Sequence, residues 1–223
     1  MQTVYPQVLE ATLYRETTPV FIYKIHYPAF ATTCNPSSAQ AINNIYARRA
    51  RAVEDYCHAV LFPAAAADAA YAQGTRPFNS YTLDMDFHLT LNTGCFVSLY
   101  TETYTYMGGA HGETRRTSDT WDFTTGRRLN LKDILPQKEN TADQLFASMT
   151  AQVRQRLEET PGAYFDNYEE LLRSAFNPES FYLRPGVLVI YFQQYDIAPY
   201  VTGLPEFYFP GAGIGNSSGR GLA

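Results

Sequence analysis

A stretch of alternating residues that ends in a cluster of glycines constrains the fold of this chain most. Two sets of side chains alternate along it: Phe96, Ser98, Tyr100, Glu102, Tyr104 and Tyr106 on one face, and Val97, Leu99, Thr101, Thr103 and Thr105 on the other. This period of two predicts a β-strand. Gly108, Gly109 and Gly112 follow, and glycines permit positive φ and close backbone approach. The strand must therefore turn sharply at its end.

His111 is the titratable residue inside this glycine turn, and two interpretations of it stay open. In the first, the turn is a hairpin connection whose histidine holds the loop together through hydrogen bonds. In the second, His111 acts directly on a ligand. Irregular backbone costs free energy to hold in place, and such backbone is a feature of functional sites.

Further period-two segments predict strands before and after this stretch. The predicted strands cover residues 4–14, 19–28, 81–91, 113–124, 127–131, 181–183, 187–192 and 206–209. In Tyr81–Leu91 apolar and polar residues alternate cleanly, so one face is expected in the core and the other in water. Val187–Phe192 is apolar at every position, which predicts a central strand covered on both faces.

Capping signals and apolar stripes predict the helices. Asn35-Pro36 opens the first one, with Asn35 as N-cap, and Pro63 is expected to break or restart it. Ala64–Ala72 favours a second helix that ends near Gly74. Two more helices are predicted, over residues 141–157 and from Asn167, paired with Glu170 as a capping box, to about residue 175.

The resulting fold class is α+β, built from two small units of mainly antiparallel sheet packed with helices. We expect the first unit at residues 1–115 and the second at 116–210. Residues 211–223 are rich in glycine and serine and are expected to be a disordered tail.

Charge and hydropathy exclude two classes of partner. The net charge of −5 disfavours nucleic acid, which requires a basic patch. The chain contains no apolar run long enough to span a membrane, and no signal peptide is recognisable at Met1.

The 3 cysteines, Cys34, Cys57 and Cys95, lack metal-ligand spacing and allow at most one disulfide.

No catalytic constellation is recognisable in the sequence. P-loop, dinucleotide-binding, GxSxG and HExxH motifs are all missing. His58 follows Cys57 but leaves the same helix in another direction, which disfavours a cysteine nucleophile. Asp84, Asp86 and His88 line one strand face, but this ladder spans about 13 Å, too far for a single ion to bridge, so we expect a solvated face.

Two loops rich in glycine and aromatic residues stand out instead. They are Tyr104–Gly112 and Gln193–Pro205, and exposed tyrosines in loops on a rigid sheet are typical of recognition surfaces, although they also serve as plain loop packing. The candidate ligand-binding residues are Tyr104, Tyr106, His111, Tyr195, Asp196, Tyr200 and Glu206. We expect the two loops to lie side by side, with His111 within reach of the Tyr195–Glu206 segment.

Three segments of the chain resemble a bacterial extracytoplasmic family of paired domains of unknown function. Tyr104–Gly112 is similar to its YxYxGGAHG signature, and Phe181–Phe207 is similar to an apolar strand that leads into its YxIAPYxxGxPEF loop. The Thr125-Gly126 turn before Leu129–Leu135 resembles its TGxxLxLxDlf segment. These paired domains form the extracellular part of the lysozyme-sensing anti-sigma factor RsiV. The first of them is also appended to the peptidoglycan deacetylase PdaC, and many members are lipoproteins or secreted proteins of Gram-positive bacteria.

The resemblance implies a non-catalytic binding or sensing module of the cell envelope. Its location would be extracytoplasmic, as a secreted, lipid-anchored or membrane-tethered protein, and its ligand a protein such as lysozyme or a cell-wall glycan. No cofactor and no metal are expected. The alternative is a peptidoglycan-acting enzyme, or a module attached to one, with a site near His111 and either Asp196 or Glu206.

Overall fold

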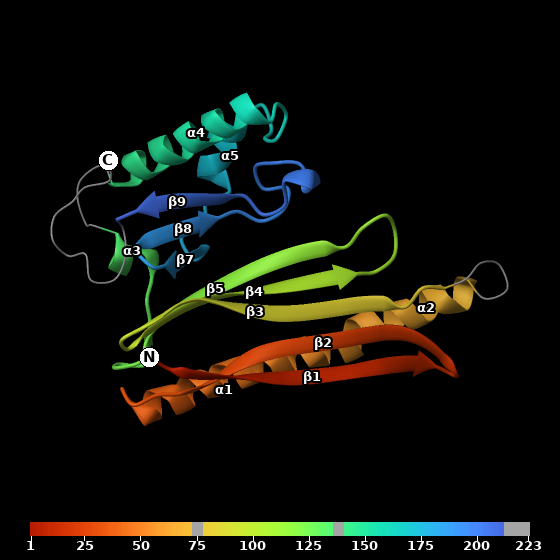
Figure 1. The fold of residues 1–223 in the computed structure, drawn as a ribbon. Helices are drawn as coiled ribbons and strands as arrows, with labels where there is room; N and C mark the ends of the chain where they lie inside the picture. Colours follow the sequence, from red (N-terminus) through yellow and green to blue (C-terminus); the bar gives the residue numbers. More distant parts are fainter. Residues whose placement is uncertain (73–77, 136–140, 212–223) are drawn as a thin grey trace. The chain divides into compact units, whose positions relative to one another are not determined.

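The computed structural model describes residues 1–72, 78–135 and 141–211 (Figure 1). Its strands are β1 (Thr3–Arg15), β2 (Thr18–Ala31), β3 (Tyr81–Thr93), β4 (Phe96–Tyr106), β5 (Glu113–Asp122), β6 (Arg127–Arg128), β7 (Phe181–Arg184), β8 (Val187–Tyr191) and β9 (Glu206–Pro210). Its α-helices are α1 (Pro36–Tyr56), α2 (Phe62–Ala72), α3 (Leu131–Ile134), α4 (Thr141–Glu159) and α5 (Tyr168–Ser174). The predicted α+β class is confirmed.

The strands form two sheets. One has the order β1-β2-β3-β4-β5-β6 and the other the order β7-β8-β9. Neighbouring strands of the larger sheet follow one another in the sequence, and β2 and β3 run parallel although a mainly antiparallel sheet was expected. Their parallel pairing needs a long crossover, and the helical segment over residues 36–72 supplies it.

The described chain divides into two compact units. Unit 1 comprises Met1–His88, Thr101–Arg115 and Phe123–Gly126, and unit 2 comprises Leu89–Tyr100, Arg116–Asp122 and the chain from Arg127 onward. Strands β3, β4 and β5 thus contribute residues to both units. The predicted domain boundaries at 115 and 210 stay a prediction, and the predicted tail lies outside the described residues beyond Gly211.

In unit 1, α1 and α2 run along one face of the sheet (Figure 1). Asn35 caps α1 as predicted, because its side chain accepts hydrogen bonds from the backbone N–H groups of Ser37 and Ser38 at 3.1 and 3.3 Å. Pro63 was expected to break or restart the first helix, and the structure shows the second outcome, because α2 begins at Phe62. A π-helical turn over Cys57–Leu61 joins α1 to α2, and Pro63 then falls in the first turn of α2, where a missing N–H is tolerated.

In unit 2, the central strand β8 is buried on both faces, as predicted. Leu188, Ile190 and Phe192 enter the core that also contains Met149 of α4 and Leu172 of α5. Val189 and Tyr191 point to the other face, where they meet Tyr182 and Tyr100. The predicted capping of α5 by the Asn167 side chain is not observed; instead the Asn167 carbonyl accepts from Glu170 N–H at 3.1 Å.

The apolar face of β3 is buried over only part of its length. Tyr81, Leu83 and Met85 are buried, but Leu89 is exposed, which the uniform alternation did not predict. Leu89 is the residue at which β3 passes from unit 1 to unit 2, so the core of unit 1 ends before it.

Candidate functional site

The loop Gln193–Pro205 connects β8 to β9 and is anchored in unit 2 at several points. Asp196 accepts a hydrogen bond from Gln193 N–H at 2.8 Å, and Asp196 N–H donates back to the Gln193 carbonyl at 3.2 Å. The Thr202 hydroxyl donates to the Ala163 carbonyl at 2.6 Å. Phe165 N–H donates to the Ile197 carbonyl at 3.2 Å, and Ile197 and Ala198 are fully buried. The middle of the loop is therefore fixed to the core.

A second anchor ties the start of this loop to β5. The Gln193 amide makes a reciprocal pair with the Arg116 backbone: it accepts from Arg116 N–H at 2.9 Å and donates to the Arg116 carbonyl at 2.7 Å. The Gln193 amide makes the two hydrogen bonds that a neighbouring strand would make, so the N–H and the C=O of Arg116 both have partners. The loop thus leaves β8 in a defined direction.

On this fixed frame the loop exposes aromatic and apolar side chains. Tyr195 is 55 % exposed and Val201 is 88 % exposed. The Tyr195 ring lies 5.9 Å from the ring of Tyr200, with the planes tilted by 36°. Tyr195 also has φ of 66°, the left-handed region that side chains other than Gly, Asn and Asp rarely adopt. Exposed apolar area on a rigid, locally strained loop is typical of an interaction surface.

Glu206, the last of the candidate residues, lies at the end of this loop but is engaged in a network. Its carboxylate pairs with the guanidinium of Arg116 and accepts hydrogen bonds from the hydroxyls of Tyr182, at 2.8 Å, and Tyr208, at 2.5 Å. The Arg116 guanidinium also lies over the Tyr100 ring, 4.2 Å from its centroid. The network links β5, β7 and β9 of unit 2.

The pKa of Glu206 reflects this environment. Burial raises the pKa of the carboxyl, but the hydrogen bonds from Tyr208, Arg116 and Tyr182 outweigh burial, so the pKa lies below its usual value. Burial, and then the hydrogen bond to Glu206, raise the pKa of Tyr182. Glu206 is thus an anion whose oxygens already have donors, and this geometry suits a structural role better than acid–base catalysis.

The glycine turn after β4 is explained by close packing in unit 1. A Cβ atom at Gly108 would lie 2.7 Å from the Tyr81 hydroxyl, and one at Gly112 would lie 2.6 Å from the Tyr104 ring. The Tyr106 hydroxyl donates to the Gly109 carbonyl at 3.2 Å. Tyr104 and Tyr106 are half-buried and help to shape the turn.

His111 lies on the surface of this turn. Its side chain is exposed, and Nδ1 donates to the Gly112 carbonyl at 3.1 Å. The tyrosine–glycine contacts above therefore account for the turn without a buried histidine. His111 belongs to unit 1 and Tyr195–Glu206 to unit 2, so the expected proximity of the two loops stays a prediction.

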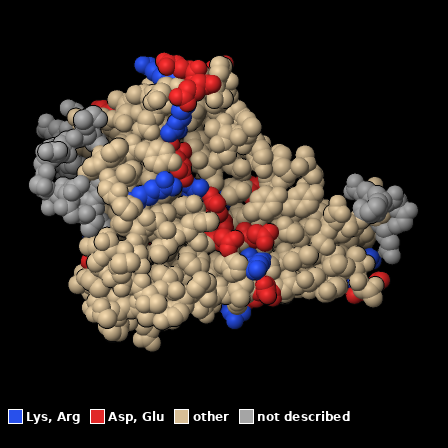
Figure 2. Space-filling view, viewed as in Figure 1, with Lys and Arg blue, Asp and Glu red and all other residues tan. Residues whose placement is uncertain are grey.

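The polar face of the unit 1 sheet is exposed, as predicted for Asp84, Asp86 and His88. Asp86 pairs with His26 of β2, and His88 lies 3.9 Å from Glu102. Charges of both signs lie next to one another over this sheet in Figure 2. Within residues 1–72, 78–135 and 141–211, no group of 3 or more His, Cys, Asp or Glu side chains is placed to hold a metal ion.

The cysteines offer no nucleophile. Cys34 and Cys95 are disulfide-bonded, whereas Cys57 is a free, fully buried thiol. Burial, and next the nearby Glu54 charge, raise the pKa of Cys57 to about 12, so the thiolate is not formed at neutral pH.

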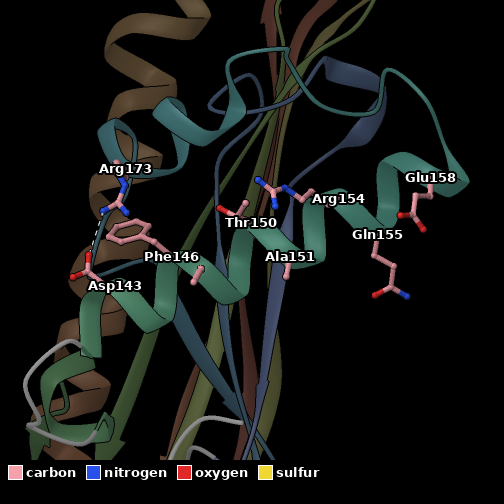
Figure 3. Close-up of a pocket in the computed structure, with 9 residues that line it drawn as sticks. Asp143, Phe146, Thr150, Ala151, Arg154, Gln155, Glu158 and Arg173 are labelled. Carbon is pink, nitrogen blue, oxygen red and sulfur yellow. Dashed lines mark ion pairs between the residues drawn. The ribbon is translucent and has the colours of Figure 1, made fainter.

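A shallow hollow of about 520 Å³ runs along the outer side of α4 in unit 2 (Figure 3). Phe146 and Arg173 line one end, where Arg173 lies 3.7 Å from Asp143 and 4.6 Å from the centre of the Phe146 ring. None of the candidate residues predicted from the sequence lines it. The ion pair and the stacked arginine engage the polar groups at this end of the hollow.

The sequence patterns did not identify two residues that the structure shows in or beside the Gln193–Pro205 loop. Val201 stands in a run that resembles an ordinary loop, and only its 88 % exposure distinguishes it. Arg116 is one of two adjacent arginines in β5, and strand alternation alone could have assigned it to the buried face. Its partner Glu206 is distant in sequence, so the pairing itself left no local signal.

The fold and the site together define a two-unit α+β protein that presents an anchored aromatic loop. Residues 14–114 match the family model described as "Deacetylase PdaC", and residues 132–211 match the model described as "Protein of unknown function (DUF3298)". The two matches together support the PdaC-like family of domains of unknown function that the signatures resemble.

Solved structures of the DUF3298 family share the fold. One, from Bacteroides fragilis NCTC 9343, has a TM-score of 0.67 and 19 % identity over 94 % of this chain and 90 % of its own. Another, from Pseudomonas aeruginosa PAO1, has a TM-score of 0.58 and 18 % identity over 96 % of each chain. None of the curated proteins matches the sequence. Across the described residues, no helix is long and apolar enough to cross a membrane.

Proposed function

We propose that this protein is a non-catalytic binding module of the cell envelope, which captures a protein or glycan ligand on the Gln193–Pro205 loop. The observation that carries the proposal is the exposure of Tyr195 and Val201 on a loop whose neighbouring residues are buried and hydrogen-bonded. A rigid loop loses little conformational entropy on binding, so its exposed apolar area is available to stabilise a complex.

An extracytoplasmic location is part of this proposal. The disulfide-bonded state of Cys34 and Cys95 supports it, because disulfides persist in oxidising compartments. The resemblance of the two signatures to domains of a lysozyme-sensing receptor makes lysozyme the first ligand to test. Tyrosine rings also stack on sugar rings, so soluble peptidoglycan fragments are the second.

The test is a binding titration of the full chain with lysozyme and, separately, with muropeptides. Tyr195→Asn removes the ring, and Asn tolerates the left-handed backbone at this position. Val201→Ser removes an exposed apolar side chain. As control, Tyr71→Ser alters a residue that is 84 % exposed on α2 of unit 1.

For a ligand that binds at the loop, Tyr195→Asn is expected to weaken affinity at least about 10-fold, as for an aromatic hot spot. Tyr71→Ser should leave the affinity unchanged. Equal affinities for wild type and both loop variants would contradict the assignment of the loop as the binding surface.

The alternative, an enzyme or enzyme-attached module that acts on peptidoglycan, rests on the exposed imidazole of His111 within the segment that matches the deacetylase model. Release of acetate from acetylated peptidoglycan by the wild-type chain, and its loss in a folded His111→Ala variant, would support it.

A further inference from the structure

Strand β1 is the end strand of the larger sheet and has an open edge. It pairs with β2 over its whole length, from Thr3 opposite Ala31 to Arg15 opposite Thr18. Among residues 1–72, 78–135 and 141–211, no other strand pairs with it. A strand of 13 residues with one open edge is a template for another strand unless its edge is protected.

Two prolines show which backbone groups face outward. Pro6 lies opposite Pro28, and neither proline has an N–H group, so this is a pair without hydrogen bonds between its members. Residues at even positions of β1 therefore turn their N–H and C=O groups away from β2. The Gln7 side-chain amide donates to the Pro6 carbonyl at 3.1 Å and to the Tyr5 carbonyl at 3.4 Å. Beyond Pro6, the open edge runs without a proline from Val8 to Tyr14.

Apolar side chains flank this open edge on both faces of the sheet. On the face away from the helices, Val8 is 47 % exposed and Tyr14 is 55 % exposed. On the helix-covered face, Leu9, Ala11 and Leu13 are half-buried at the margin of the unit 1 core. A strand added to this edge would extend the sheet and complete the cover of these side chains.

We propose that the open edge of β1 binds β1 of a second copy of this chain, as an antiparallel pair with Ala11 opposite Ala11. This register sets Val8 opposite Tyr14 on the outer face and Leu9 opposite Leu13 on the core face. Cross-strand pairs of an aromatic with a β-branched residue, such as Val8 with Tyr14, are stabilising. A two-fold axis at Ala11 closes the assembly as a dimer.

Two other registers, centred on Glu10 and on Val8, are less favourable. Centring the pair on Glu10 sets Glu10 opposite Glu10, and like charges directly opposite each other are destabilising. Centring it on Val8 sets Pro6 opposite Glu10, where Pro6 has no N–H to donate. In the Ala11 register, Glu10 faces Thr12, and Gln7 faces Arg15.

The test uses matched charge variants of Thr12, an exposed residue of β1, in the full chain. Sedimentation equilibrium over a micromolar concentration series is expected to show a dimer for the wild type. Thr12→Glu sets two carboxylates opposite each other twice in the dimer and should weaken dimerisation about 2- to 30-fold. Thr12→Lys sets an ammonium group opposite the Glu10 carboxylate and should retain or strengthen the dimer.

Cross-linking tests the register independently. Ala11→Cys is expected to form an intermolecular disulfide under mild oxidation, because residues directly opposite in such a pair have Cα atoms about 4.5 Å apart. Ala64→Cys, at an exposed position on α2, is the control and should remain uncross-linked. A wild-type monomer at every concentration, or a dimer that responds equally to Thr12→Glu and Thr12→Lys, would overturn the proposal.

Discussion

Glu206→Gln removes the negative charge that faces Arg116, and unit 2 is expected to lose about 3 kcal/mol of unfolding free energy. The side chains of Arg116 and Glu206 are only 8 % and 18 % exposed. Water therefore solvates the Arg116 guanidinium poorly once its partner has lost its charge. Removing one partner of a buried pair costs about 3–5 kcal/mol. The lower end applies because Glu206 is not fully buried and because the new amide can accept from one of the two tyrosine hydroxyls, Tyr182 or Tyr208, and donate to the other.

Urea unfolding followed by tryptophan fluorescence measures this loss. Trp121 is the single tryptophan of the chain and is buried in unit 2, so it reports on the unit that contains the pair. The control is Glu169→Gln, which breaks the Arg154–Glu169 pair with 66 % and 57 % exposed side chains. Exposed pairs contribute little, so the control should not shift the unfolding midpoint. A Glu206→Gln shift no larger than that of the control would refute the reasoning.

Acid titration gives an independent check on the same residue. The folded-state pKa of Glu206 lies below that of the unfolded chain, so its stabilising contribution is present at neutral pH and is lost as the pH falls through the lowered pKa. Between neutral pH and that range, the wild type should therefore lose more stability than Glu206→Gln. Parallel pH profiles for the two proteins would contradict a lowered pKa.

Three further substitutions test the core, the glycine turn and His111. Ile190→Ala should cost about 2–5 kcal/mol in urea unfolding, because Ile190 is buried on the α4 side of β8. Gly108→Ala should destabilise unit 1 by about 1–3 kcal/mol more than Gly109→Ala: both glycines have positive φ, but only at Gly108 would the new Cβ meet Tyr81. His111→Ala should leave the thermal midpoint unchanged, because the side chain is exposed; a large drop would instead mean that the histidine supports the turn.

Much of the fold could be predicted because local patterns agreed with the tertiary structure. The apolar run Val187–Phe192 predicted a strand buried on both faces, and Asn35-Pro36 predicted the start of α1. The errors arose where tertiary context decided the outcome. Pro63 lies at the start of α2, as one of its two predicted outcomes, but no composition signal marks the π-helical turn over Cys57–Leu61 that precedes it.

The candidate site was predicted less completely than the fold. The sequence identified the Gln193–Pro205 loop because it combines proline, glycine and tyrosine in an irregular stretch. It could not distinguish the exposed Tyr195 from Glu206, which the network with Arg116 occupies. That distinction depends on contacts between β5 and β9, which are distant in the sequence.

Tyrosine has two separate uses within unit 2, and the difference bears on the proposed function. Tyr182 and Tyr191 are fully buried and Tyr100 half-buried around the Arg116 guanidinium, where their rings stabilise a charge that is largely shielded from water. Tyr195 is on the surface, and its ring contacts Tyr200. The interior network fixes the strands around the loop, and Gln193, the first residue of the loop, is hydrogen-bonded to the backbone of Arg116 within that network. Loss of the Arg116–Glu206 pair should therefore weaken ligand binding at Tyr195 as well as stability, although neither residue reaches the exposed surface of the loop.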